Sequence, residues 1–426
     1  MNNIQEKSKE WLRQTDDIMN LSITTLSKNN LNTINYVKLD SGIQNNEFAK
    51  KYGVGSLTKF VTSIGIIKLH EENKLTIDDK VIMHLPKFKG YIDNDVTILD
   101  LLTHSSKYPS DGFLSYILDG QTERRKEYNS NLDFMEYIEK LYSKDFRDTN
   151  LLCNFYYYNT GYILLGKIIK EVTGKTYENY IINEILNPLN INECSFHPVS
   201  NEIYRKSVYE DMTGVNIINK DINPAGGLII STKDYAKLIQ NITNNNSIIN
   251  SYDTIVESHN ERKKFTCGNK SYYGMGVKIQ NIDNDTLIYH RGAMACNSWF
   301  GYLQNKNVGI VLSCDGRPNN DISELGKYIM LENKDPRYKL NKFLRNVTGK
   351  YGLENDVRHA HIEKHTNNNL LIKFGYENNY EEIILQPIDI QNNICQFVGD
   401  DGSINKVRFT SDYSKMKFRR WLLIRQ

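Results

Sequence analysis

The chain has 426 residues, of which 39% are hydrophobic and 24% charged, as expected for a globular protein with two or three structural units. The 53 Lys and Arg residues nearly balance the 51 Asp and Glu residues, so the formal net charge is +2. This balance gives no support to a nucleic-acid partner or to binding at an anionic membrane surface.

The N-terminus and the cysteines bear on the cellular compartment. The sequence from Met1 lacks the apolar core of a secretory signal, and no run of about 18 apolar residues that would span a membrane occurs. If Met1 is the true start, we expect a cytoplasmic protein; if the chain has been trimmed, secretion stays open. The six cysteines show no Cys-x-x-Cys spacing. This favours free thiols over a zinc or redox site, with one or two disulfides left open.

The first part of the chain predicts a helix, two strands and a second helix. Residues 5–19 carry apolar side chains at helical spacing, which predicts an amphipathic helix. Two strand-like runs follow at residues 21–26 and 33–39. Residues 57–72 then predict a buried helix, because apolar side chains cover most of its surface.

The middle of the chain is mostly helical in pattern, with long loops from residue 75 to residue 240. One helix, over residues 163–172, is expected to end at the C-cap Thr173-Gly174. From about Tyr272 the pattern changes, and residues 320–332 predict a closing helix. The strands expected in between are 276–280, 286–289, 297–303 and 308–313. This order predicts an α/β (α+β) fold, with an antiparallel sheet lobe into which a helical lobe is inserted.

A second unit is expected from about Leu340, with the domain boundary after residue 337, so that the domains are 1–337 and 338–426. Its short strand-like runs alternate with Asn, Asp and Gly turns, which predicts a small all-β barrel or sandwich. The clearest of these runs are 370–374, 382–386 and 406–409.

The strongest local signal for chemistry is Gly55-Ser56-Leu57-Thr58-Lys59. Positions i and i+3 of a helix share a face, so Ser56 and Lys59 can touch. A serine hydroxyl is a poor nucleophile until a neighbour removes its proton, and a partly desolvated lysine can do this. On its own, Ser-x-x-Lys arises by chance in many chains.

Two further motifs follow in order, Tyr157-Tyr158-Asn159 and then His290-Arg291-Gly292 at the end of a predicted strand. This order resembles the serine β-lactamase-like and penicillin-binding protein family, which includes class C β-lactamases, D-alanyl-D-alanine carboxypeptidases and esterases of the family VIII type. Intervening stretches are also similar to that family: Leu101-Leu102-Thr103-His104-Ser105, Pro224-Ala225-Gly226-Gly227 and Tyr273-Gly274-Met275-Gly276. The resemblance covers roughly residues 20–335.

The resemblance implies acyl transfer, in which Ser56 attacks a carbonyl and becomes acylated. It implies that Lys59 and Tyr157 share the general-base task, without deciding which takes the proton first. Asn159 is expected to hold the lysine and the substrate amide. The backbone N–H groups of Ser56 and Ala293 are expected to form the oxyanion hole.

The third motif departs from the family pattern at two positions. His290 stands where most β-lactamases of this group have lysine, and histidine there is similar to carboxypeptidases, esterases and D-amino-acid peptidases. This argues against antibiotic resistance as the main role. Arg291 stands where a small hydroxyl residue is usual; it either faces solvent or points inward to pair with a substrate carboxylate. Gly292 is expected to leave room for substrate beside the strand.

The histidines outside these three motifs are not expected to be catalytic. His104 is expected to be a structural hydrogen-bonding residue of the helical lobe. His359, His361 and His365 have metal-like spacing, but alternate strand positions ordinarily place side chains in solvent, so no metal site is expected. The sequence has no Gly-x-Ser-x-Gly elbow, phosphate loop or dinucleotide fingerprint. The run from Thr348 opens a unit that resembles the lipocalin-like barrel appended to some of these hydrolases.

The expected function is therefore a serine hydrolase that acts through an acyl-enzyme, without cofactor, on amide or peptide bonds of a small molecule or short peptide. A D-residue peptide or carboxypeptidase-like substrate is favoured, with penicillin binding. A carboxylesterase or a weak β-lactamase of the same fold is the alternative. A catalytically silent binding or sensing module is the alternative of another class, and the oligomeric state is left open.

Overall fold

The chain forms two compact units, Met1–Met330 and Leu331–Gln426. The boundary predicted from the sequence, after residue 337, falls within helix α15 (Pro336–Val347). The computed structural model describes residues 2–15, 18–46, 50–108, 155–196, 220–244, 248–250, 255, 271–282, 284–293, 296–316, 321–331, 336–352, 358–376, 379–398, 404–419 and 421–426.

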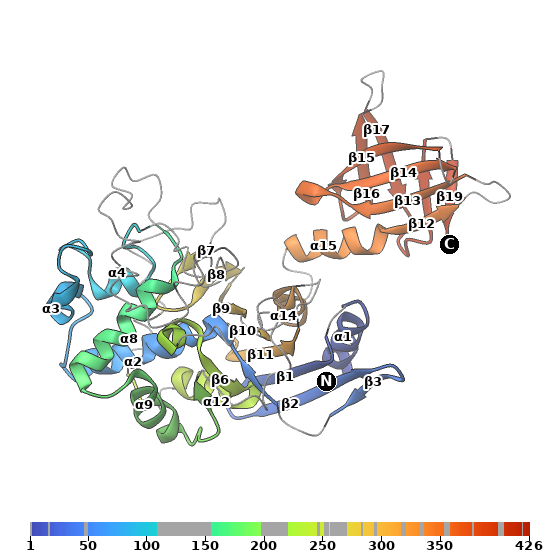
Figure 1. Ribbon diagram of the computed structural model, residues 1–426. Helices are drawn as coiled ribbons and strands as arrows, with labels where there is room; N and C mark the ends of the chain where they lie inside the picture. Colours follow the sequence, from blue (N-terminus) through green and yellow to red (C-terminus); the bar gives the residue numbers. More distant parts are fainter. Residues whose placement is uncertain are drawn as a thin grey trace, which may run out of the picture. The chain divides into compact units, whose positions relative to one another are not determined.

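An antiparallel eight-stranded sheet organises the first unit, in the order β3-β2-β1-β11-β10-β9-β8-β7 (Figure 1). Pairing of β1 with β11, in which Leu21 lies opposite Cys314, joins the two ends of this unit. The strands are β1 Asn20–Ser27, β2 Leu31–Leu39, β3 Gly42–Asn45, β7 Ser271–Tyr273, β8 Lys278–Ile282, β9 Asp285–Ala293, β10 Cys296–Leu303 and β11 Val308–Asp315. The sheet lobe predicted from the sequence is confirmed.

Helix α1 spans Asn2–Arg13, so the prediction that it continues to residue 19 was wrong. The Asp315 carboxylate accepts the backbone N–H groups of Met19 and Asn20 at 2.9 and 2.8 Å, which fixes the start of β1 instead. Ile18 is 2% exposed and reaches the core from the connection between α1 and β1. Its burial produced the apparent helical pattern.

Helices cover both faces of the sheet. On one face, α1 and α14 (Ile322–Leu331) enclose an apolar cluster built around the fully buried Trp299. On the other face lie α2 (Thr58–Glu71) and α12 (Thr232–Thr243), and α8 (Asn159–Thr173) packs on α2.

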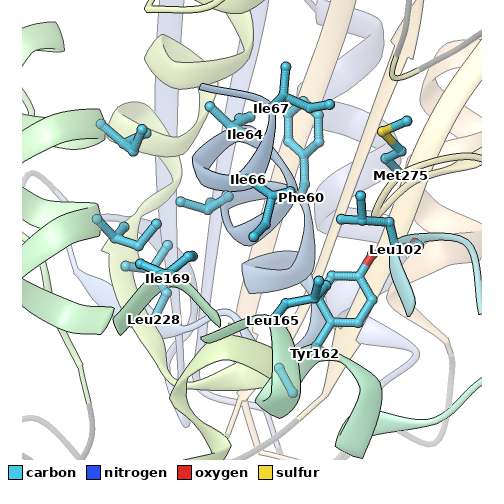
Figure 2. Packing of buried hydrophobic residues seen from close by; sticks show 14 of the residues in the cluster. Phe60, Ile64, Ile66, Ile67, Leu102, Tyr162, Leu165, Ile169, Leu228 and Met275 are labelled. Carbon is cyan, nitrogen blue, oxygen red and sulfur yellow. Dashed lines mark hydrogen bonds between the residues drawn. The ribbon is translucent and has the colours of Figure 1, made fainter. Parts of the chain in front are cut away.

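Helix α2 is buried on nearly all sides, as its apolar sequence predicts. Figure 2 shows Phe60, Ile64 and Ile67 of this helix among side chains of the surrounding elements. Helix α8 ends at Gly174 in the left-handed conformation, φ 69°, so the predicted C-cap is confirmed. The elements that enclose α2 thus surround the side chains at its N-terminus.

Short elements complete the first unit. A three-stranded sheet, β4-β6-β5, lies beside the N-terminus of α2. These elements are β4 Lys51–Gly53, η1 Gly55–Leu57, α3 Val81–His84, η2 Pro86–Phe88, α4 Ile98–Leu102, α9 Tyr177–Tyr180, η4 Ile181–Leu186, η5 Asn187–Leu189, β5 Ser195–Phe196, η6 Lys220–Ile222, α11 Asn223–Gly226 and β6 Leu228–Ser231.

The second unit is a closed antiparallel barrel of eight sequential strands, β12 to β19, preceded by α15 (Figure 1). Inward side chains such as Tyr351, Phe397 and Phe418 fill its interior. On β13 Ala360 and Ile362 are buried, whereas His361 between them is exposed. The strands are β12 Gly349–Gly352, β13 His359–Lys364, β14 Leu370–Tyr376, β15 Asn379–Asp389, β16 Ile394–Val398, β17 Ile404–Phe409, β18 Lys415–Phe418 and β19 Trp421–Arg425; the short helix η7 spans Thr366–Asn368.

Four of the six cysteines lie in the described part of the chain, Cys194, Cys296, Cys314 and Cys395, and each is a free thiol. Burial raises the pKa of the Cys296 thiol to about 12. Cys153 and Cys267 lie outside the described residues. Among the described helices, none has the length and apolar character that a membrane crossing requires.

Candidate active site

The turn that carries Ser56 is held from several sides. It is a single 3-10 turn, Gly55–Leu57, that leads directly into α2. The Thr58 hydroxyl donates to Gly55 O at 2.7 Å and accepts the Leu228 N–H at 3.1 Å. The buried hydroxyl of Tyr235 donates to Leu57 O at 2.9 Å. Ser56 itself is only partly buried, so a fixed backbone presents its hydroxyl at the surface of the lobe.

Lys59 lies one helical turn beyond Ser56 and is fully buried. Its Nζ is 3.1 Å from Ser56 Oγ, 2.8 Å from Asn159 Oδ1 and 2.7 Å from the carbonyl oxygen of Ala225. The contact that the i, i+3 spacing predicts between Ser56 and Lys59 is therefore present.

These three contacts fit two protonation states of Lys59. An ammonium group has three N–H donors, and three oxygens stand around it. A neutral amine has two N–H donors and one lone pair. The oxygens of Asn159 and Ala225 can only accept, so the lone pair would face Ser56 Oγ. The same geometry therefore suits a lysine that receives the serine proton and later returns it.

The Tyr157-Tyr158-Asn159 segment enters α8 beside Lys59. Asn159 is the first residue of that helix, and the ring centroid of Tyr157 lies 4.9 Å from Lys59 Nζ. The ring of Tyr162, one turn further, lies 5.6 Å from the same nitrogen. Aromatic faces attract a cation at these distances, which helps to accommodate a buried ammonium group.

His290 lies on β9, with its ring centroid 6.1 Å from that of Tyr157. Its Nδ1 is 2.7 Å from the Arg291 carbonyl oxygen, which can only accept, so Nδ1 carries the proton. In the neutral ring Nε2 then accepts the hydroxyl of Tyr273, 3.1 Å away. Burial, with Lys278 and Lys59 nearby, lowers the pKa of His290 well below its usual value. His290 is thus a neutral ring with both nitrogens engaged.

Gly292 and Ala293 bring the edge of β9 against the turn that carries Ser56. Gly55 adopts φ 55°, and a Cβ there would lie 2.7 Å from Ala293 N. A Cβ on Gly292 would lie 1.8 Å from Val54 O. Only glycines allow this approach, which places the backbone of Ala293 next to that of the Ser56 turn.

The Gly292→Ala variant is expected to displace the turn that carries Ser56, because the added Cβ meets backbone rather than a movable side chain. We expect turnover to fall about 10- to 100-fold and the free energy of unfolding to fall by about 1–3 kcal/mol. Steady-state kinetics and urea unfolding measure the two effects. Gly65→Ala is the control, because a Cβ there meets only the side-chain tips of Ile181, Tyr180 and Ile169 at 3.0 Å or more. Equal effects in both variants would contradict this account of Gly292.

The residues described so far, Ser56, Lys59, Tyr157, Asn159 and His290, form one cluster. Arg291 is separated from this cluster. It pairs across the sheet with Trp299, whose side chain lies on the α14 side. Its guanidinium forms an ion pair with Asp321 at 3.2 Å and donates to Asn297 Oδ1 at 3.4 Å, and 47% of the side chain is exposed. The alternation of β9 places Arg291 on the face opposite His290.

Some residues of the cluster were not assigned from the sequence. The Ala225 carbonyl accepts from Lys59, and the Tyr273 hydroxyl meets His290. Both lie in stretches whose similarity to the family was visible, Pro224–Gly227 and Tyr273–Gly276, but a backbone acceptor leaves no side-chain signal. Among the described residues, no three His, Cys, Asp or Glu side chains gather as a metal ion requires.

Two buried histidines should make the folding stability depend on pH. His104 is fully buried, and burial, with Lys59, His290 and Lys278 nearby, lowers its pKa well below the usual value, as for His290. The unfolded chain binds protons at these histidines below about pH 6.5, whereas the folded chain does not, so stability is full above that pH and falls below it.

Each such histidine contributes about 1.4 kcal/mol per pH unit in this range. We therefore expect the free energy of unfolding to fall by about 2–3 kcal/mol between pH 6 and pH 5. Urea unfolding at several pH values measures the slope. His104→Asn should roughly halve the contribution, whereas His361→Asn, at an exposed site on the barrel, should leave it unchanged. An identical slope in the wild type and His104→Asn would contradict the expectation.

Two curated relatives of the chain come from Staphylococcus aureus. "Protein flp" of strain N315 is 30% identical over 276 residues, which cover 62% of this chain and 52% of that protein. "Teichoic acid D-alanine hydrolase" is 29% identical over 214 residues, which cover 49% of each protein. The chain thus spans about half the length of the curated relatives it matches.

Solved structures share the fold. The octameric penicillin-binding protein homologue from Pyrococcus abyssi has a TM-score of 0.73 at 22% identity and covers 100% of this chain and 98% of its own. A D-stereospecific amidohydrolase from Streptomyces sp. has a TM-score of 0.59 at 15% identity and covers 77% of this chain and 97% of its own. The Beta-lactamase family model matches residues 35–333, and the chain therefore belongs to the Beta-lactamase family, as the order of its motifs predicts.

Proposed function

We propose that this chain is a serine hydrolase that forms an acyl-enzyme on Ser56 and acts on small substrates with a D-residue. The observation that carries the proposal is the contact of Lys59 Nζ with Ser56 Oγ at 3.1 Å, inside a buried set of hydrogen bonds. A serine whose hydroxyl meets the amine of a buried lysine has the base that nucleophilic attack requires.

In acylation, Ser56 Oγ attacks the substrate carbonyl carbon and its proton passes to Lys59 or Tyr157. The carbonyl oxygen becomes an oxyanion that accepts hydrogen bonds from the backbone N–H groups of Ser56 and Ala293. The bond to the leaving group then breaks, and the leaving amine or alcohol takes the proton. The close approach of Gly55 to Ala293 supports this assignment of the oxyanion hole.

In deacylation, water attacks the acyl carbon, and its proton passes through the same base to Ser56 Oγ as the ester bond breaks. We do not assign His290 to this proton transfer, because its pKa is lowered and its Nδ1–H is held by the Arg291 carbonyl. Asn159 keeps Lys59 in place through both steps and offers its amide N–H₂ to the substrate.

A D-residue is proposed on two grounds. Histidine at the start of the third motif resembles the peptidase-like branch of the family more than its β-lactamases. One relative is named as a hydrolase of D-alanine on teichoic acid, and one structure of the same fold is a D-stereospecific amidohydrolase. Arg291 lies on the face of β9 opposite His290 and pairs with Asp321. We therefore do not assign Arg291 to binding a substrate carboxylate.

The experiment compares p-nitroanilides of D- and L-alanine, a p-nitrophenyl ester and a chromogenic cephalosporin, each with the wild type and Ser56→Ala. We expect the D-anilide to be cleaved at least about tenfold faster than the L-anilide, and only by the wild type. Cleavage of the ester alone would make the chain a carboxylesterase, and cleavage of the cephalosporin alone a β-lactamase. Folded wild type without any turnover would favour a binding module.

A further inference from the structure

A histidine outside the three motifs lies against the catalytic cluster. His104 follows α4 (Ile98–Leu102), is fully buried and adopts φ 56°. The left-handed region is unfavourable for a residue with a Cβ. A non-glycine residue keeps this conformation only where the surrounding structure holds it there, and such residues cluster at functional sites.

His104 holds the chain on both sides of Tyr157. The backbone N–H of Tyr156 donates to the carbonyl oxygen of His104 at 3.0 Å. The backbone N–H of Tyr158 donates to Nδ1 of the His104 ring at 3.4 Å. The residues immediately before and after Tyr157 are therefore both tied to His104.

The ring of His104 also contacts the ring of Tyr157. Their centroids are 4.4 Å apart, and the Tyr157 ring centroid is 4.9 Å from Lys59 Nζ. The His104 ring lies 4.7 Å from that of Tyr273, the residue whose hydroxyl meets His290. One imidazole thus contacts the aromatic residues that line both Lys59 and His290.

Stability alone does not account for a histidine at this position. Because Nδ1 accepts a hydrogen bond, the proton of the neutral ring lies on Nε2. Within the described residues, Nε2 is buried and has no hydrogen-bond partner. A buried N–H without a partner is destabilising, and so is the left-handed backbone.

We propose that His104 is a positioning residue, which holds the phenol of Tyr157 over Lys59 through the two backbone contacts and the ring contact. This inference rests on the proposed function, in which Tyr157 is part of the base. His104 acts through Tyr157 and takes no proton from the substrate. An imidazolium would lose the Nδ1 acceptor and add a cation beside Lys59, His290 and Lys278, so the neutral ring is the one that fits.

Two variants separate the contacts. His104→Asn tolerates the left-handed backbone and keeps an acceptor near the position of Nδ1, but removes the ring contact. His104→Gly relieves the backbone strain and removes both the acceptor and the ring. His84→Asn is the matched control, because the hydrogen bond of the His84 side chain goes to Asp79, in the same unit and outside the cluster.

The experiment measures the phosphonylation of Ser56 by a fluorophosphonate, in which Ser56 Oγ displaces fluoride from phosphorus, as the maximal rate and the half-saturating concentration, together with thermal unfolding. In His104→Asn we expect the maximal rate to fall roughly tenfold to a hundredfold, with the half-saturating concentration changed less than about threefold. His104→Gly should be slower still, and His84→Asn should match the wild type. A folded His104→Asn that is phosphonylated at the wild-type rate would overturn the proposal.

A crystal structure of each His104 variant gives a readout that does not depend on activity. We expect the Tyr157 ring to leave its place near Lys59 Nζ or to occupy more than one position. An unmoved Tyr157 in both variants would overturn the positioning role even if the wild type never reacted with the probe. Failure of the wild type to react, with Tyr157 displaced in the variants, would instead reject the proposed function and leave His104 as the residue that positions Tyr157.

Discussion

Replacing Ser56 with alanine is expected to lower turnover about 10⁴- to 10⁶-fold, since the proposed acyl intermediate forms on the Ser56 hydroxyl. The change removes one partly exposed oxygen, and Lys59 keeps its contacts with Asn159 and Ala225. The free energy of unfolding should therefore change by no more than about 1 kcal/mol. Turnover of the D-anilide and urea unfolding measure the two quantities.

Ser8→Ala is the control for this substitution. Ser8 is a buried serine of α1 whose hydroxyl donates to Ile4 O at 2.6 Å, remote from the cluster in sequence and contacts. We expect it to leave turnover unchanged. Activity of Ser56→Ala above about one-hundredth of the wild-type value would contradict the assignment of the nucleophile.

Replacing Lys59 with methionine is expected to lower the acylation rate about 10³- to 10⁴-fold, because Ser56 then lacks the amine that contacts its hydroxyl. The variant keeps an unbranched side chain in a fully buried site. Loss of the donor leaves the oxygens of Asn159 and Ala225 unsatisfied, at about 1–3 kcal/mol each. Removal of a buried charge offsets part of that cost.

Fluorophosphonate labelling kinetics and urea unfolding measure the effect of Lys59→Met. Lys68→Met is the matched control on the same helix, where the lysine forms a surface ion pair with Glu72 at 2.7 Å. Such a pair contributes about 0–1 kcal/mol, and its loss should not change labelling. Labelling of folded Lys59→Met at the wild-type rate would show that another group removes the serine proton.

The contact between Ser56 and Lys59 was predictable because it depends only on helical geometry. Three residues along a helix return the side chain to the same face, and the apolar pattern of residues 57–72 predicts that helix. The resemblance implied the approach of Asn159 to Lys59 across a hundred residues. No local rule could have produced that contact, because it depends on how α8 packs on α2.

The points that the sequence left open depend on which face of a strand a side chain occupies and on contacts of backbone atoms. Arg291 and His290 are neighbours on one strand, and the pairing of Arg291 with Trp299 decides which of them lies on the α14 face of the sheet and which on the α2 face. The acceptor at Ala225 is a carbonyl oxygen, which every residue has. The end of α1 was misjudged because Ile18 is buried without being helical. Helix α15 was not foreseen, although Asp335-Pro336 at its start is a usual N-terminal signal of a helix.

The most direct test of the central claim is intact-protein mass spectrometry after incubation with a fluorophosphonate and, separately, with a fluorescent penicillin. We predict one adduct per wild-type chain with the fluorophosphonate, mapped to Ser56 by peptide analysis, and none in Ser56→Ala. A penicilloyl adduct that persists for minutes is predicted for a peptidase-like site. An adduct on another residue, or no adduct with either probe on folded wild-type protein, would contradict the acyl-enzyme account.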